Sequence, residues 1–162
     1  MRTTLDHTAL GDILPGTWVI AATNFPMWIT GERSEARLTY ELIERDPLVL
    51  SDEVSYLNAD GELKKIVGRD TWRDNGFVWR GTGWLKPFAS SWSVDGVSDD
   101  DSIAVIRFSK SLTTPAGIDI VVRKGSHRPD VRAIVARSTD HFGLSPEDLG
   151  SLTWLATTES GW

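Results

Sequence analysis

The chain has no cysteine and only three histidines, and these scarcities exclude several kinds of chemistry. Without cysteine there is no disulfide framework, no thiolate nucleophile and no cysteine-based metal site. His7, His127 and His141 do not have the spacing of metal ligands, and the acidic run at residues 99–101 reads as a solvated loop. We therefore expect no metal site.

Long apolar runs are also absent. No segment approaches the roughly 20 apolar residues of a membrane-spanning helix, and residues 1–14 lack the apolar core of a signal peptide. We therefore expect a cytoplasmic protein without a membrane span. The net charge of −6 disfavours nucleic acid and anionic membranes as partners. Phosphate-binding, dinucleotide-binding and nucleophile-elbow motifs do not occur, so no cofactor is predicted.

From residue 17 onward the sequence consists of short strand-like segments separated by turns rich in Gly, Asp and Asn. Alternating apolar and polar residues, or short apolar runs, mark the strands. The predicted strands are residues 17–24, 35–45, 48–58, 62–72, 77–84, 90–97, 102–111, 117–125 and 130–138. Helix is expected only near the two ends, over residues 3–13 and 144–156, with Thr8 or Asp12 capping the first and Ser145 the second.

This pattern predicts a single all-β domain over residues 1–162. Strands do not alternate with helices, which excludes a parallel sheet and indicates an antiparallel meander. A meander of about eight strands hides its edges either as a sandwich or as an up-and-down barrel. Because the connections are short and sequential, we expect an eight-stranded antiparallel up-and-down β-barrel, with a short N-terminal helical segment and a C-terminal helix.

Two segments far apart in the chain resemble motifs of the bacterial lipocalins. PGTWVIAATNFPMW (residues 15–28) resembles the Gly-x-Trp opening motif, carried here by Gly16 and Trp18. VRAIVARSTDHFGLSPEDLGSL (residues 131–152) is similar to the last barrel strand and the helix after it, with Arg137 at the strand's end. In a barrel the first and last strands are neighbours, so Arg137 would lie on the Trp18 ring and close the narrow end.

The resemblance departs from the family at one loop. Lipocalins usually carry a Thr-Asp-Tyr-like motif between two late strands, whereas residues 111–119 have Thr113, Thr114 and Asp119 but no tyrosine. This difference leaves the subfamily open.

The eight tryptophans are the unusual feature of the composition. Four of them, Trp72, Trp79, Trp84 and Trp92, fall in the middle strands and would either line a cavity, fill the core or cover the outside of the barrel. Residues 23–33 are too apolar for a bare loop and would form a lid over the mouth or contact a partner subunit. The predicted ligand-binding residues are Asn24, Phe25, Met27, Trp28, Leu38, Tyr40, Leu50, Val54, Tyr56, Trp79 and Trp92.

Several charged residues share a face with apolar neighbours. A carboxylate at Asp52 would have either a raised pKa or an arginine partner if it lies inside the barrel, or it would be solvated at the mouth. Arg69 and Asp70 are adjacent on one predicted strand, so one of them must face inward. Arg107 would anchor an anion or pair with an aspartate.

These features are consistent with two kinds of function, a binding protein and an enzyme. The first is a carrier or sequestering protein, monomeric or homodimeric, that binds a small aromatic, polyene or lipid-like ligand in the barrel. The alternative is an isomerase or cyclase acting on a hydrophobic secondary metabolite, with Asp52, Tyr56 or Tyr40 as acid or base. A filled barrel with a structural or interaction role is a third possibility.

Overall fold

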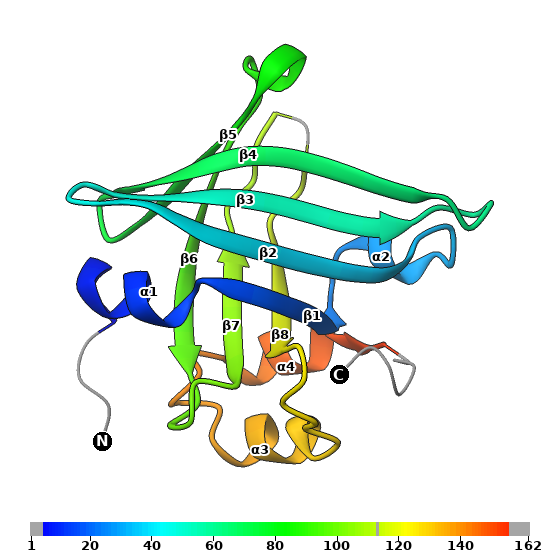
Figure 1. Cartoon of the computed structure of the whole chain (residues 1–162). Helices are drawn as coiled ribbons and strands as arrows, with labels where there is room; N and C mark the ends of the chain where they lie inside the picture. The colour runs from blue at the N-terminus through cyan, green and yellow to red at the C-terminus, as the bar shows by residue number, and fades with distance from the viewer. Residues whose placement is uncertain (1–4, 113, 156–162) are drawn as a thin grey trace.

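The computed structural model describes residues 5–112 and 114–155, and within them eight antiparallel strands close into a barrel (Figure 1). The barrel strands are β1 (Gly16–Thr23), β2 (Ser34–Arg45), β3 (Leu48–Leu57), β4 (Leu63–Arg73), β5 (Gly76–Gly81), β6 (Ala89–Val97), β7 (Ile103–Phe108) and β8 (Gly117–Arg123). Each strand pairs with the next, and β1 closes the ring by pairing with both β2 and β8. The predicted up-and-down barrel is confirmed.

The helices lie before, between and after the strands. They are α1 (His7–Ile13), α2 (Pro26–Ile29), the 3-10 turn η1 (Gly83–Leu85), α3 (Val131–Arg137) and α4 (Pro146–Ser151). Ser145 caps α4 as predicted, accepting from Asp148 N, while Asp6 and not Thr8 or Asp12 caps α1. Residues 3, 4 and 156 of the predicted helical segments, and Thr113, lie outside the described residues.

Residues 130–138 form helix α3 and not the predicted strand. Val131, Ile134 and Val135 have helical spacing and turn toward the outer face of the barrel, where Val131 and Val135 are buried. A short apolar run fits a strand or one side of a short helix equally well, so periodicity did not separate the two. The eighth barrel strand is β8, and a two-residue strand β9 (Thr153–Trp154) adds to β1 after α4.

The closed end of the barrel holds the expected cation on Trp18, but the arginine is a different one. Trp18 pairs with Arg123 in the β1–β8 register, and the Arg123 guanidinium lies 4.3 Å from the centre of the Trp18 ring. Arg123 also donates to the carbonyls of Ile13 and Pro15, which ties β8 to the segment entering β1. The predicted partner, Arg137, is exposed at the end of α3.

Two apolar cores lie on opposite sides of the barrel wall. The interior core contains Trp18, Tyr40 and Trp92 and extends into α1. The outer core lies between β7–β8 and the C-terminal helices, which cover this part of the wall (Figure 1). Arg107 holds the C-terminal segment to β6 by ion pairs with Asp95 (2.6 Å) and Asp148 (2.8 Å), so pairing with aspartates is what the structure shows for it.

Candidate functional site

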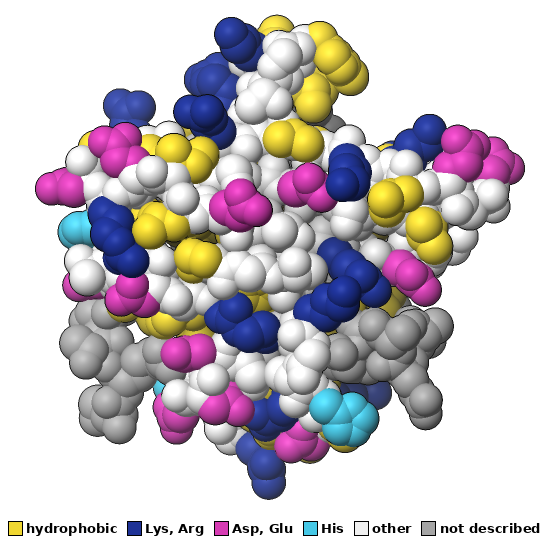
Figure 2. Space-filling view, in the orientation of Figure 1, with side chains coloured by type: hydrophobic (Ala, Val, Ile, Leu, Met, Phe, Trp, Pro, Cys, Tyr) yellow, Lys and Arg dark blue, Asp and Glu magenta, His cyan; other side chains and the backbone are white. Residues whose placement is uncertain are grey.

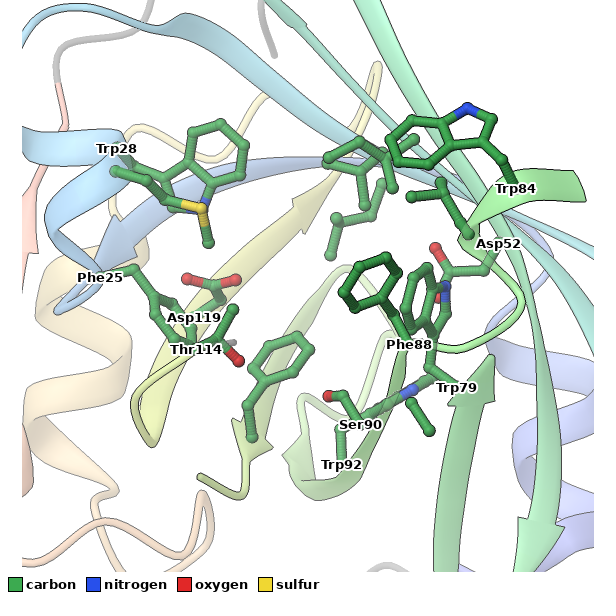
Figure 3. A pocket seen from close by; sticks show the side chains of 17 residues that line it. Phe25, Trp28, Asp52, Trp79, Trp84, Phe88, Ser90, Trp92, Thr114 and Asp119 are labelled. Carbon is green, nitrogen blue, oxygen red and sulfur yellow. The ribbon is translucent and has the colours of Figure 1, made fainter. Parts of the chain in front are cut away.

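A cavity of about 340 Å³ occupies the end of the barrel opposite Trp18, where β1 runs into α2 (Figure 3). Its size is in the range of small-molecule sites. The lining residues are Phe25, Met27, Trp28, Leu38, Asp52, Val54, Ile66, Trp79, Trp84, Leu85, Phe88, Ala89, Ser90, Trp92, Phe108, Thr114 and Asp119. They come from both walls of the barrel and from three connections at its open end.

Two glycines let aromatic rings lie flat against the cavity wall. A Cβ at Gly68 would be 2.2 Å from Nε1 of Trp79, and a Cβ at Gly117 would be 2.3 Å from Cζ of Phe25. Neither position has room for a side chain. The two glycines therefore create the recesses that hold Trp79 and Phe25 at the cavity.

A stack of three rings lies at the deep end of the cavity, and Trp92 is the member that lines it. Phe77 and Trp92 face each other across β5 and β6 with centroids 4.4 Å apart, and Tyr40 stacks on Trp92 at 5.6 Å. The Trp92 indole nitrogen donates to Oδ1 of buried Asp70 at 2.8 Å. This hydrogen bond fixes the Trp92 ring and so the shape of the cavity floor.

The segment predicted as a lid or a subunit contact, residues 23–33, forms α2 and its flanks beside the cavity. Phe25, Met27 and Trp28 line the cavity, whereas Ile29 is exposed. The Arg33 guanidinium packs over the rings of Tyr56 (4.7 Å) and Trp28 (5.9 Å), which braces α2 against β3.

Across the mouth from α2, the β5–β6 connection projects from the barrel and carries Trp84, which is 83% exposed, and Phe88 (Figure 2). Figure 2 shows this connection as a protrusion with hydrophobic and basic side chains at the top of the view. Both aromatic residues also line the cavity, so an apolar path leads from the surface inward.

Among the described residues, three aspartates have carboxyl groups that are buried inside the barrel, and each has one oxygen without a hydrogen-bond partner. Burial raises the pKa of Asp119 to about 7, although the hydrogen bond with Thr23 opposes the rise. Burial likewise raises the pKa of Asp52 to about 6, which the hydrogen bond with Asp70 opposes. Burial, and then the neighbouring Asp52, raise the pKa of Asp70 well above its ordinary value, which the hydrogen bond from Trp92 opposes.

The structure thus places Asp52 inside the barrel with a raised pKa, the first of the alternatives considered for it, and turns Asp70 inward rather than Arg69. Burial also raises the pKa of Tyr40 well above its ordinary value. The pKa values of Asp52 and Asp119 lie near neutral pH, whereas that of the Tyr40 phenol is raised away from it.

Most of the predicted binding residues meet at the cavity. Seven of them line it: Phe25, Met27, Trp28, Leu38, Val54, Trp79 and Trp92. Four are not among the lining residues: Asn24, which bonds Ile118 N and Ser151; Tyr40 and Leu50, which pack in the core; and Tyr56, beneath Arg33. Their roles in binding stay predictions.

Sequence reasoning did not select Asp119 or Phe108 for the site. Asp119 is the one charged residue in the apolar run GIDIVV, and a single carboxyl among apolar residues could have marked it as a candidate for the site. The sequence does not distinguish Phe108 in this way, because an apolar residue near the end of a strand is expected in a filled core as much as in a cavity wall.

Comparison with known proteins bears on the fold. No family model matches the chain, and neither does any curated protein. Among solved structures, lobster apocrustacyanin A1 aligns over 99% of this chain and 90% of its own, with a TM-score of 0.64 and 12% identity. The chain has the lipocalin fold. The siderocalin Ex-FABP aligns over 91% of this chain and 97% of its own (TM-score 0.62, 15% identity).

A third lipocalin-fold structure, the bovine lipocalin allergen Bos d 2, aligns over 89% of this chain and 93% of its own (TM-score 0.57, 12% identity). In the part of the chain that the structure describes, no group of three or more histidines and carboxylates could hold a metal ion. No helix within that part has the length and apolar character needed to cross a bilayer.

Proposed function

We propose that this lipocalin-fold protein binds a small hydrophobic molecule in its barrel, as a carrier or sequestering protein. The observation that carries the proposal is the aromatic cavity of about 340 Å³ at the open end. The lipocalin fold supports it, because a barrel of eight strands has room for one small ligand. Binding would be driven by burial of apolar area, at roughly 25 cal/mol per Å².

Neutral apolar probes test this proposal directly. We expect 1-naphthylmethanol, dodecanol or retinol to change the tryptophan fluorescence, because Trp79, Trp84 and Trp92 line the cavity. Isothermal titration calorimetry would then give the affinity. The proposal fails if none of the three binds.

A matched pair of valine substitutions locates the binding. Val54 lines the cavity, whereas Val67 is exposed on β4 and is absent from the lining. Val54→Phe should reduce probe affinity by filling part of the space, and Val67→Phe should bind as the unmodified protein does. Equal affinities in the two variants would place binding elsewhere.

A second candidate function is an isomerase or cyclase working in the same cavity. The specific observation in its favour is Asp119, whose pKa of about 7 lets the carboxyl give or take a proton near neutral pH. The deciding measurement is mass spectrometry and chromatography of the ligand recovered after incubation. An altered ligand with the unmodified protein, and an unaltered one with Asp119→Asn, would support the enzyme.

A further inference from the structure

The charged groups on the cavity wall all have one sign. Among the described residues that line the cavity there are two aspartates and no lysine, arginine or histidine. Arg33, a cation at the lid, packs on the rings of Tyr56 and Trp28 and donates to Sδ of Met27, and it is not among the residues that line the cavity. A ligand inside the barrel therefore meets acidic groups without a basic counterpart.

Asp119 is the better placed of the two aspartates to contact a ligand. It lies on β8 opposite Thr23, is 2% exposed, and its Oδ1 has no hydrogen-bond partner. Figure 3 shows its carboxyl pointing into the cavity close to Phe25, Trp28 and Thr114. A buried carboxylate oxygen without a donor is costly, and a donor supplied by the ligand would relieve that cost.

Asp52 projects from the opposite wall beside Trp79 (Figure 3). It is 6% exposed, and its Oδ1 is also without a partner. Its side chain is also hydrogen-bonded with buried Asp70. Among the described lining residues, the opposite wall thus adds a second carboxyl group to the cavity and no basic side chain.

We propose that the ligand of this cavity is an organic cation, an ammonium group on an aromatic or other apolar body, with the ammonium bound at Asp119. The inference rests on the proposed binding function and names its ligand class. An ammonium supplies the donors that the carboxylate lacks, and the rings of Phe25 and Trp28 beside it attract a cation through their faces. A fatty acid or other carboxylate would instead meet like charge in a low-dielectric space.

The surroundings of Asp119 make its charge depend on the ligand. On the neighbouring strands, β1 places Thr23 and β7 places Ile106 opposite it. The titratable groups that face the interior from the other strands, Tyr40, Asp52 and Asp70, are all acids. No cation among the described residues contributes to the pKa of Asp119, so its raised pKa keeps the carboxyl protonated up to about pH 7, and binding of an ammonium should release that proton near neutral pH.

Three probes with one ring system separate ligand charge from ligand shape. We would titrate 1-naphthylmethylamine, 1-naphthylmethanol and 1-naphthoate at about pH 7 and compare their dissociation constants. The amine should bind at least about tenfold more tightly than the alcohol, as expected for a charge-assisted hydrogen bond. The naphthoate should bind more weakly than the alcohol. Calorimetry in buffers of different ionisation enthalpy should also show proton release with the amine.

Two substitutions of equal charge change assign the effect to a residue. Asp119→Asn should remove most of the amine's advantage over the alcohol and its proton release, and near-ultraviolet circular dichroism of the tryptophans should show that the barrel is folded. Asp99→Asn, on the exposed turn at the closed end, should keep both properties of the unmodified protein.

The outcomes of these titrations distinguish failure of the inference from failure of the proposed function. An amine that binds no better than the alcohol, or a naphthoate that binds best, overturns the inference while leaving the proposed binding function intact. Persistence of the amine's advantage in Asp119→Asn overturns the assignment to this residue. Binding of none of the probes contradicts the proposed function itself, and the inference with it.

Discussion

Replacing Asp119 by asparagine removes a carboxyl that makes the empty protein lose stability as the pH rises. Its pKa is about 7 in the folded protein and has an ordinary value of 3.8. Between these values the unfolded chain has lost the proton and the folded protein still holds it, so the free energy of unfolding falls with increasing pH across that window. The difference between the two pKa values, at about 1.4 kcal/mol per pH unit, corresponds to ~4 kcal/mol of unfolding free energy.

The measurement is urea unfolding of the unmodified protein and Asp119→Asn at about pH 4 and about pH 8. The quantity to compare is each protein's change in unfolding free energy between the two pH values, because the asparagine leaves a buried amide whose own cost is independent of pH. We expect this change to be smaller in Asp119→Asn by up to about 4 kcal/mol. Part of the decline will remain in the variant, since the pKa of Asp52 is also raised.

Asp99→Asn is the control, because it makes the same change in an exposed turn and should follow the unmodified protein at both pH values. The reasoning about Asp119 would be refuted if Asp119→Asn and the unmodified protein changed in parallel, within about 0.5 kcal/mol. Parallel behaviour would mean that the carboxyl is ionised at little cost in the folded state, through solvent or a partner that the structure does not contain.

Three further substitutions test the frame around the cavity by denaturant unfolding. Arg123→Ala should lower the free energy of unfolding by about 2–4 kcal/mol, because it removes the contact with the Trp18 ring and the hydrogen bonds to carbonyls. Arg137→Ala, at an exposed position, should change it by less than about 0.5 kcal/mol. Equal losses in the two variants would contradict the assignment of Arg123 as the partner of Trp18. Gly68→Ala should lower the free energy of unfolding by about 1–3 kcal/mol and weaken probe binding, because the added Cβ displaces Trp79. Unchanged stability and binding would show that Trp79 does not need the space above Gly68. Ser145→Ala should cost about 1 kcal/mol, and no loss would show that the cap is dispensable.

The strands were predictable because the information that specifies them is local. Alternation in segments such as residues 35–45 and 48–58, with turns between them, predicted β2 and β3 within a few residues. Sequential hairpins then left few topologies, of which the closed barrel is one. Residues 23–33 were also recognisable as a lid, because apolar side chains in a connection need something to cover.

Residues 130–138 are a segment whose secondary structure could not be predicted from the local sequence. The same apolar spacing suits a strand or a helix, and what decided it was that β8 already closes the barrel against β1. The error at Arg137 follows directly from this one, since the cation on Trp18 must come from the strand that pairs with β1.

Neighbouring residues alone specify the sequential hairpins of β2 to β7, the abundance of aromatic side chains and the single carboxyls within apolar strands. The tertiary structure decided which carboxyls meet and what surrounds them. Asp119 and Asp52 became opposite walls of one cavity because barrel closure fixes the register between β1 and β8. Burial raised their pKa values for the same reason: loss of solvent depends on every strand of the ring and on no single one.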